Sequence, residues 1–500
     1  MNRDERQDLS VDRVARAGGI GTIEGCTGYG KTNCGKKLYK RVLKKIPNAS
    51  LLVVVPTTTL KNQWTGILKA ENYANFRVET IQAITVAKNM STLERMVDVV
   101  ILDEIHLMID GEMFGQIFDV LIYKVLLGLS GTLTASQALS LEVKCPIVDT
   151  IPIEEALKNG WVAQFIEYNL YVELSREEMD EYKEVDHNFK LIYPIFNSFL
   201  KIIDCQSTED RIDPKRGAII GAETQGKRIM SRLILAGADL DVRFDHVKAW
   251  FVDDHGEWLT GTRLTTKVKD LALQANALSK RRKSILFDSD TCIDTAVEVV
   301  ESLNMKTVTF GESIYAANMM AEKLGERALP YHSKVLSQVR VKRKEKAYVR
   351  EASAIKFYEL NLCKLDNLVI EGKKVSWDHS YKVGKKTIRE ETLIKLENNE
   401  IDRVTSAKGL DVGLDVTGMQ LGVNLPSDAK KEKYNQRRGR LIRKELLVKK
   451  DKVGIIVNIV PLKTKAVEWI ERAQYGNTKI RHIHNVSDII VDNPKYTNNG

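Results

Sequence analysis

The sequence feature that most constrains the fold is the segment Gly25-Cys26-Thr27-Gly28-Tyr29-Gly30-Lys31-Thr32, which has the spacing G-x-x-x-x-G-K-T. Its glycines allow the chain to curl so that several backbone N–H groups point at one phosphate. Lys31 then brings a positive charge to the β- and γ-phosphates, and the Thr32 hydroxyl can bind Mg²⁺. A strand is expected at 20–24 and a helix at 32–45, so we predict a phosphate-binding loop for ATP at a helix N-terminus.

Length and composition narrow the class of protein. Five hundred residues predict two to four domains, and a 43% hydrophobic fraction is enough for sizeable cores. No apolar run is long enough to span a membrane, and the charged N-terminus does not resemble a signal peptide. The six cysteines are scattered without a C-x-x-C pair, so we expect a reduced, cytoplasmic protein without a zinc site. The net charge of +9 permits a polyanionic partner.

Two consecutive carboxylates follow a second buried strand. The apolar run 99–102 leads into Asp103-Glu104-Ile105-His106, some 70 residues after the phosphate loop. A strand that delivers two carboxylates to one edge of a parallel sheet is what a Mg²⁺-nucleotide site requires. We predict that Asp103 holds Mg²⁺, that Glu104 activates the attacking water, and that His106 couples this site to the rest of the protein.

Residues 51–55 and 125–129 are also short, continuous apolar runs, and predicted helical segments separate them. Continuous apolar strands that alternate with helices predict a doubly wound α/β domain with its ligand at the carboxyl ends. Hydroxyl side chains follow both strands, at 57–59 and 130–134. They either cap the next helix or bind a sugar-phosphate backbone. Residues 1–19 read as a polar helix in which Arg3 and Gln7 either read adenine or lie in solvent.

The sequence predicts that the whole chain divides into four segments. We expect the first motor domain at 1–150, a linker and mostly helical insertion at 151–280, a second α/β domain at 281–480 and a tail at 481–500. A basic segment at 335–388 interrupts the second domain and interleaves lysines with aromatic residues. It is either a solvated face or a nucleic-acid contact made by Arg340, Lys342, Arg343, Lys344 and Trp377.

Several arginines cluster late in the sequence, at Gln436-Arg437-Arg438-Gly439-Arg440-Leu441-Ile442-Arg443. Arg440 and Arg443 are three residues apart, so they share one face of a helix. Two guanidinium groups on one face suit an arginine finger that stabilises charge on a transferring phosphoryl group. A basic surface helix is the alternative.

In this order, the motifs resemble those of the superfamily 2 helicases. The loop at 25–32 looks like motif I, 56–64 like motif Ia, 103–106 like a D-E-x-H motif II, 130–132 like motif III and 436–443 like motif VI. The resemblance also implies a catalytic role for Gln436 and nucleotide contacts for Gly413 and Asp415, which lie in a motif V-like loop. It implies nucleic-acid contacts for Pro56, Thr57, Thr58, Thr80, Gln82, Ser313, His332 and Ser406.

Within that superfamily the chain looks most like compact phage-type branch-migration helicases, through the linker at 154–162 and Tyr331-His332-Ser333. The resemblance implies two RecA-like domains that use ATP and Mg²⁺ to unwind forked or branched DNA. It also favours a monomer, possible phage origin and no membrane partner. An RNA helicase and the motor subunit of a restriction-type assembly stay open as alternatives, because D-E-x-H does not separate DNA from RNA.

Overall fold

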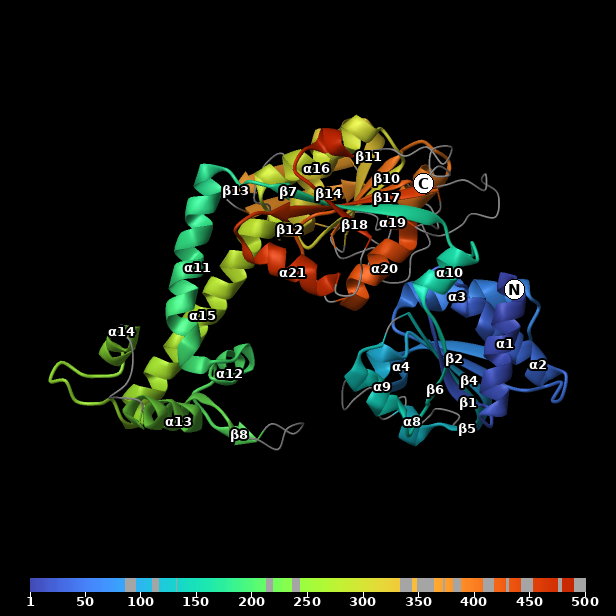
Figure 1. Ribbon diagram of the computed structural model, residues 1–500, viewed down its shortest axis with the longest axis horizontal. Helices are drawn as coiled ribbons and strands as arrows, with labels where there is room; N and C mark the ends of the chain where they lie inside the picture. The colour runs from blue at the N-terminus through green and yellow to red at the C-terminus, as the bar shows by residue number, and fades with distance from the viewer. Residues whose placement is uncertain are drawn as a thin grey trace. The chain divides into compact units, whose positions relative to one another are not determined.

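The structure is a computed structural model, and every structural statement below concerns the residues that it describes. These are 1–85, 96–109, 117–131, 133–212, 219–235, 243–332, 344–348, 364–371, 374–380, 388–407, 418–428, 431–441, 453–474 and 479–489. The chain divides into two compact units, Met1–Val172 together with Cys292–Gly500, and Glu173–Thr291 (Figure 1). No helix within the described ranges combines the length and the apolar character that crossing a membrane requires.

A six-stranded parallel sheet forms the first domain of the larger unit, in the order β3-β2-β4-β5-β1-β6. Its strands are β1 (Ile20–Gly25), β2 (Leu51–Val55), β3 (Phe76–Thr80), β4 (Met96–Asp103), β5 (Ile122–Ser130) and β6 (Ile147–Ile151). Every residue of β2 is buried, as expected for an apolar strand covered on both faces. Because the strands are parallel, their carboxyl ends meet at one edge of the sheet.

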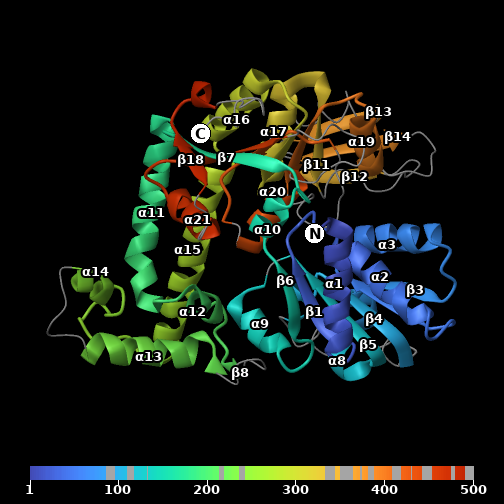
Figure 2. The same cartoon turned by 45° about the vertical axis from the view of Figure 1, so that its right-hand side comes forward.

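Helices cover both faces of this sheet (Figure 2). They are α1 (Arg3–Arg16), α2 (Lys31–Leu43), α3 (Thr58–Ala70), α4 (Ile81–Thr85), α6 (His106–Ile109), α8 (Ile117–Val120), α9 (Ala135–Leu141) and α10 (Ile153–Lys158). Side chains alternate along β2, so Val53 and Val55 pack in a core with α1, α2 and α3. Leu52 and Val54 pack in a second core with α4, α6 and α9.

A seven-stranded parallel sheet forms the second domain, in the order β11-β15-β10-β16-β17-β7-β18. Its strands are β7 (Gln164–Val172), β10 (Thr307–Gly311), β11 (Ala328–His332), β15 (Arg403–Ala407), β16 (Leu421–Asn424), β17 (Val453–Pro461) and β18 (Ile480–Ile483). Its helices are α16 (Asp290–Leu303), α17 (Ile314–Leu324), η1 (Gly325–Arg327), α19 (Ile388–Glu397), α20 (Lys431–Leu441), α21 (Lys465–Ala473) and η2 (Val486–Asp488).

The second domain does not begin where the sequence places it. We expected its start at residue 281, but β7 pairs with β17 along its whole length and with β18 on its other side. Gln164–Val172 is therefore an interior strand of the second sheet, although it precedes the helical unit in sequence. The pairing partner lies almost 290 residues away, so no local pattern in the sequence reveals it.

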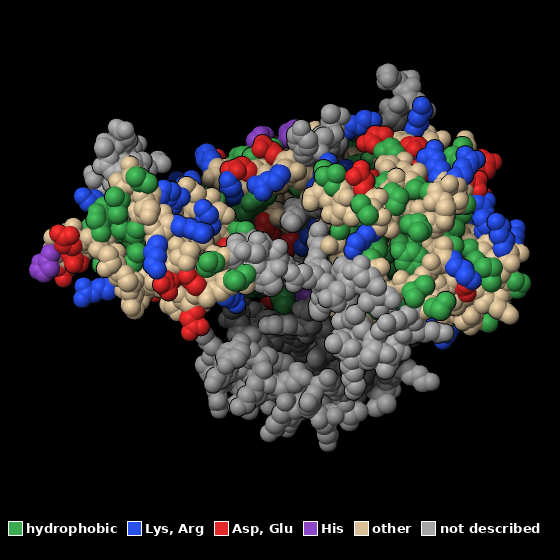
Figure 3. Space-filling view, turned by 90° about the horizontal axis from the view of Figure 1, so that it is seen from below, with side chains coloured by type: hydrophobic (Ala, Val, Ile, Leu, Met, Phe, Trp, Pro, Cys, Tyr) green, Lys and Arg blue, Asp and Glu red, His purple; other side chains and the backbone are tan. Residues whose placement is uncertain are grey.

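The unit Glu173–Thr291 is helical and has a core of its own. Its elements are α11 (Arg176–Phe196), α12 (Phe199–Asp204), β8 (Arg211–Ile212), β9 (Ile219–Ile220), α13 (Ala222–Leu235), α14 (Arg243–Ala249) and α15 (Gly261–Phe287). Helices α11 and α15 run side by side in opposite directions, and Phe196, Val268 and Ala272 are buried in its core (Figure 1). Acidic, basic and hydrophobic side chains intersperse over its visible surface (Figure 3).

Within the basic segment at 335–388, three strands form an antiparallel sheet in the order β12-β14-β13. They are β12 (Lys344–Tyr348), β13 (Lys364–Glu371) and β14 (Lys374–Ser380), and the last two pair as a hairpin. The predicted fold class, two doubly wound parallel-sheet domains, is therefore confirmed. The helical insertion follows β7, so it lies within the second domain and not between the two domains as predicted.

Candidate nucleotide site

The phosphate loop connects the end of β1 to the start of α2, as the sequence predicts. Gly28 and Gly30 have φ values of 87° and 96°, a left-handed conformation that residues with a side chain rarely adopt. The Lys31 ammonium group donates to the carbonyl oxygen of Gly25 at 3.0 Å, so it lies over the loop. A Cβ at Gly131, at the end of β5, would come within 3.5 Å of that ammonium group.

Helix α1 belongs to this site, which the sequence analysis left open. The Gln7 side chain is buried, and its amide donates to the carbonyl oxygen of Tyr29 in the loop at 2.9 Å. The Tyr29 hydroxyl lies 3.1 Å from the Ser10 hydroxyl, and the Tyr29 ring centroid is 5.9 Å from that of Trp161. The interpretation of α1 as a solvated helix is therefore wrong for this face.

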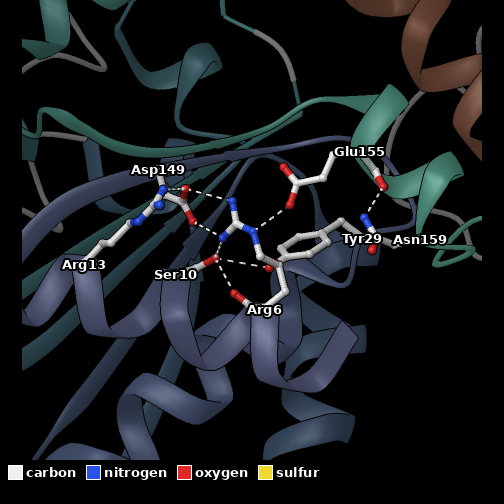
Figure 4. A network of polar contacts seen from close by, with 7 residues as sticks. All are labelled: Arg6, Ser10, Arg13, Tyr29, Asp149, Glu155 and Asn159. Atoms are coloured by element: carbon white, nitrogen blue, oxygen red, sulfur yellow. Dashed lines mark hydrogen bonds and ion pairs between the residues drawn. The ribbon is translucent and has the colours of Figure 1, made fainter. Parts of the chain in front are cut away.

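Buried charges anchor α1 beside the loop (Figure 4). Arg6 donates to both carboxylate oxygens of Asp149 on β6, at 2.6 and 3.0 Å, and its Nε donates to Glu155 on α10 at 2.8 Å. Arg13 also forms an ion pair with Asp149. Burial raises the pKa of Asp149, but the hydrogen bond and charge of Arg6 outweigh it, and the net pKa is lowered. The buried face of α1 is mostly polar, with Arg6, Gln7 and Ser10 beside Val11 and Val14, so hydrophobic periodicity did not reveal this anchor.

The two predicted carboxylates lie together where β4 ends. Asp103 is buried, and its Oδ1 accepts from the backbone N–H of Glu104 at 3.2 Å. Glu104 adopts φ 55°, which turns its side chain away from the strand direction. One of its carboxylate oxygens, Oε2, is buried without a hydrogen-bond partner among the described residues. His106 Nδ1 lies 3.5 Å from that oxygen and 3.1 Å from the hydroxyl of Ser130 on β5.

Asp103 has a second hydrogen bond, which the sequence analysis did not predict. The indole N–H of Trp64, on α3, donates to its Oδ2 at 2.8 Å. Burial is the main cause that raises the pKa of Asp103 to about 6, and the charge of Glu104 adds to it. The Trp64 hydrogen bond and the charge of Lys31 oppose that rise, so both stabilise the ionised carboxylate.

These residues fit a Mg²⁺-nucleotide. Magnesium binds through one or two carboxylates and keeps several waters and phosphate oxygens as its other ligands. Asp103 supplies such a carboxylate, Thr32 lies in the first turn of the helix after the loop, and Lys31 is near enough to Asp103 to affect its ionisation. No cluster of three or more potential metal-binding residues was found in the described part of the chain. Glu104 follows Asp103 directly at this edge, so a second carboxylate lies beside the one that would hold the metal.

A pocket of about 200 Å³ adjoins the phosphate loop. Its lining includes Thr27 and Gly131 from the first domain and Asn435, Arg438 and Gly439 from α20. The contact is close, since a Cβ at Gly439 would lie 2.1 Å from the Cβ of Thr27. The guanidinium group of Arg438 lies over the Phe165 ring, 5.5 Å from its centroid, and donates to Asn435.

Among the described residues, Arg438 is the arginine that lines this pocket. Arg440 lies near the end of α20, but its side chain is outside the described residues, and so is the whole of Arg443. Gln436 is half-buried on the same helix. Arg437 is buried and pairs with Glu312, which follows β10, at 2.7 Å. We therefore keep Arg440 and Arg443 as predictions and add Arg438 as the arginine seen in the pocket.

The predicted nucleic-acid contacts of the first domain lie at its carboxyl edge. Pro56 is buried, whereas Thr58 and Gln82 are exposed. The Thr57 hydroxyl accepts from the backbone N–H of Leu60 at 3.3 Å and so caps α3. Thr80 caps the short helix α4 in the same way, through Ala83 at 3.3 Å. Capping is thus established for two of these hydroxyls, and binding stays a prediction.

In the second domain the structure separates the predicted contacts into one surface residue and two interior ones. Ser313 caps α17 through the backbone N–H of Ala316 at 3.2 Å and is half-buried. His332 is fully buried on β11, where its Nε2 lies 2.8 Å from the Asn318 amide oxygen. Ser406 is buried in the middle of β15. These last two side chains present no surface to a nucleic acid in this structure, because strands and helices enclose them.

Other predicted residues lie outside the described part of the chain. These are Gly413, Asp415, Arg340, Lys342, Arg343 and the side chains of Lys344 and Trp377.

The fold and this site together define a class: a nucleotide-binding protein with two RecA-like domains. Comparison with protein families gives a match to the family described as "Type III restriction enzyme, res subunit" over residues 7–91. That stretch contains most of α1, the phosphate loop and Trp64. This match supports the resemblance to the superfamily 2 helicases over that stretch of the chain.

Two solved structures match this chain over most of its length. The Hef helicase domain of Pyrococcus furiosus matches with a TM-score of 0.45 and 13% identity, over 93% of this chain and 97% of that chain. A point variant of S. cerevisiae Dbp5, bound to RNA and ADP BeF3, matches with a TM-score of 0.50 and 11% identity, over 96% of this chain and 89% of that chain. No curated protein matches the sequence.

Proposed function

We propose that the chain is an ATP-dependent DNA helicase or translocase that acts on forked or branched DNA. One observation carries the proposal: two consecutive carboxylates, the buried Asp103 and the partly exposed Glu104, lie at the carboxyl edge of the first sheet, where the charge of Lys31 of the phosphate loop acts on Asp103. Asp103 is oriented by two donors, whereas Glu104 has a buried oxygen without a hydrogen-bond partner among the described residues.

In the proposed reaction, Lys31 and the N–H groups of the loop hold the β- and γ-phosphates of ATP. Thr32 and Asp103 hold Mg²⁺, which supplies positive charge to the phosphate oxygens when it is bound. Glu104 accepts a proton from the attacking water, and its position at φ 55° directs it out of the strand. His106, between Glu104 and Ser130, is placed to link the water-activating group to the end of β5.

The second domain would complete the catalytic site. Arg440 and Arg443, three residues apart in the sequence, would stabilise charge that develops on the transferred phosphoryl group. Gln436 on the same helix, with Gly413 and Asp415, would contact the nucleotide. The pocket that Arg438 and Gly439 share with Thr27 supports a role for α20 at the phosphate loop.

Nucleic acid would bind at the carboxyl edges of both domains, around Thr57, Thr58 and Gln82 in the first and Ser313 in the second. Hydroxyl groups and helix N-termini suit contacts to a phosphate backbone. ATP-driven closure would change the distance between these footholds, and repetition would move the protein along the strand. Residues 173–291 contain 21 acidic and 19 basic residues, so the basic excess of the chain lies outside this unit. That distribution favours contact with the polyanion by the two motor domains and the basic segment at 335–388.

ATP hydrolysis in the presence of different nucleic acids tests this proposal. We expect forked DNA to stimulate turnover most, duplex and single-stranded DNA less, and RNA least, with Lys31→Ala as the inactive control. Stimulation by RNA alone would replace the proposal with an RNA helicase. Stimulation only in the presence of a partner nuclease would support a restriction-type motor, the kind of protein that the matched family's description names.

A further inference from the structure

One buried side chain connects three parts of the first domain. Trp64 lies on α3, and only 1% of its surface is exposed. Its indole N–H donates to Asp103 Oδ2 at 2.8 Å. The far edge of its ring packs on α2, because a Cβ at Gly35 would lie 2.9 Å from the Trp64 ring. The same helix α3 begins next to Thr57 and Thr58, at the proposed nucleic-acid foothold.

The hydrogen bond has a chemical consequence for Asp103. A carboxylate has two oxygens with about two lone pairs each, and an indole has a single donor and no acceptor. Trp64 fills one acceptor position on Oδ2, and the Glu104 N–H fills one on Oδ1. The two hydrogen bonds thus fix the plane of the carboxylate. Each oxygen can still accept a further contact, from a metal ion or from a water bound to that ion.

We propose that Trp64 is a positioning residue that orients Asp103 for Mg²⁺ and makes this orientation depend on the position of α3, and thus on nucleic acid bound at the start of that helix. The inference rests on the proposed function, since it assumes a Mg²⁺-nucleotide at Asp103 and nucleic acid at the start of α3. It adds a physical connection between the two sites, through one ring and one hydrogen bond, without passing through the second domain.

A packing role alone makes a different prediction. The cavity between α2, α3 and β4 requires the volume of the ring, whereas orientation of Asp103 requires the N–H. Replacement of Trp64 by 3-benzothienylalanine keeps the ring size and removes the donor. Trp64→Phe removes both volume and donor, and Trp469→Phe, in α21 of the second domain, serves as the matched loss of a buried indole far from Asp103 in the fold.

The test measures equilibrium binding of a fluorescent ADP analogue, without Mg²⁺ and across a Mg²⁺ titration. We expect the isostere to bind the metal-free nucleotide within about twofold of wild type. Its half-saturating Mg²⁺ concentration should rise about tenfold or more, as for loss of a hydrogen bond to a charged group. Trp469→Phe should match wild type in both measurements. An unchanged Mg²⁺ requirement in the isostere would overturn the positioning role.

A second arm repeats the titration with forked DNA. In wild type, DNA should lower the half-saturating Mg²⁺ concentration, and the isostere should lose at least half of that change on a logarithmic scale. If DNA changes the half-saturating Mg²⁺ concentration equally in both proteins, or leaves it unchanged in wild type, Trp64 does not connect the nucleic-acid site to Asp103. If wild type binds no nucleotide under any condition, the proposed function fails, and this inference fails with it. If wild type binds Mg²⁺-nucleotide and the isostere does so equally, only this inference fails.

Discussion

Each of the two parallel sheets has a glutamate directly after the carboxyl end of one strand, and the two glutamates differ in their hydrogen-bond and ion-pair partners. In the first sheet, Asp103 ends β4, Glu104 follows it, and Glu104 Oε2 is buried without a hydrogen bond in the described structure. In the second sheet, Glu312 follows β10 and is bound by Lys433 at 2.9 Å, Arg437 at 2.7 Å and Ser427 at 2.6 Å. The carboxylate after β10 is neutralised by two cations of its own domain, whereas Glu104 after β4 has His106 at 3.5 Å as its ion-pair partner in the described structure.

The direction of the pKa shifts agrees with this contrast. Burial raises the pKa of Asp103 to about 6, with a further rise from the charge of Glu104. Burial also acts to raise the pKa of Glu312, but the charges of Arg437 and Lys433 outweigh it and lower the pKa overall. Ionisation therefore costs stability at the first edge and supports it at the second. A shared fold thus does not predict which edge is the reactive one, and the partners of each carboxylate do.

The largest expected effect separates the two edges by turnover. Glu104→Gln should lower nucleic-acid-stimulated ATP hydrolysis by about 10³- to 10⁴-fold, because it keeps the shape and removes the general base. Nucleotide binding should persist, whereas Lys31→Ala should weaken it. Steady-state kinetics with nucleotide titrations measure both effects. Wild-type turnover in Glu104→Gln would remove the assignment of the first edge as the catalytic one.

The next effect concerns stability at the second edge. Glu312→Gln leaves the buried guanidinium of Arg437 without its counter-charge, so the free energy of unfolding should fall by about 3 kcal/mol or more. Urea denaturation followed by circular dichroism measures it. The lowered pKa of Glu312 means that its ionised form stabilises the protein above the ordinary carboxyl range and that this contribution is lost as the pH falls through the folded pKa. The difference between wild type and Glu312→Gln should therefore shrink in acid, and a difference that is constant with pH would contradict this account.

Asp103→Asn should show the opposite sign. The folded pKa of Asp103 is raised from 3.8 to about 6, so its stabilising contribution is present below pH 4 and is lost as the pH rises through 6. Asparagine does not ionise, and its single amide oxygen keeps the Trp64 hydrogen bond and gives up the longer one from the Glu104 N–H, which places the expected gain below the full electrostatic cost. At pH 7.5 without nucleotide or Mg²⁺, the variant should be more stable than wild type by about 1–3 kcal/mol, and this gain should vanish near pH 4. Thermal melts at both pH values check it, and a less stable variant at pH 7.5 would show that the first edge is not strained by its charge.

The smallest effect compares the helix caps at the two edges. Thr57 caps α3 and Ser313 caps α17, each after a strand of its own sheet. Thr57→Ala and Ser313→Ala should each lower the free energy of unfolding by about 1 kcal/mol, and Thr57→Ser should restore most of the loss. Salt-dependent DNA binding of the same variants shows whether the hydroxyls do more than cap. If the variants lose stability and keep the DNA affinity of wild type, both residues cap their helices and do not bind DNA.

Local sequence signals were enough for the fold class and for the first edge. The glycine spacing placed the phosphate loop between β1 and α2, and the carboxylates at 103–104 lie where a buried strand ends. Long-range contacts were not predictable. The pairing of β7 with β17 and the contact of Arg6 with Asp149 each join residues far apart in sequence, and neither strand nor helix periodicity contains that information. The Trp64 N–H gave no signal, because a buried tryptophan reads as core.

The base of the helical unit has a consequence for how such a protein evolves. The backbone N–H of Ser175 donates to the Thr291 hydroxyl at 3.2 Å, and that hydroxyl donates to Glu178 at 2.5 Å. The two ends of the helical unit, at Ser175 and Thr291, are therefore adjacent. Residues 176–290 form an insertion that starts and ends at one place in the fold. A gene can gain, lose or exchange such an insertion in one event, because the order of the strands before and after it does not change. Lineages that share this motor are thus free to differ most in the segment between those two points.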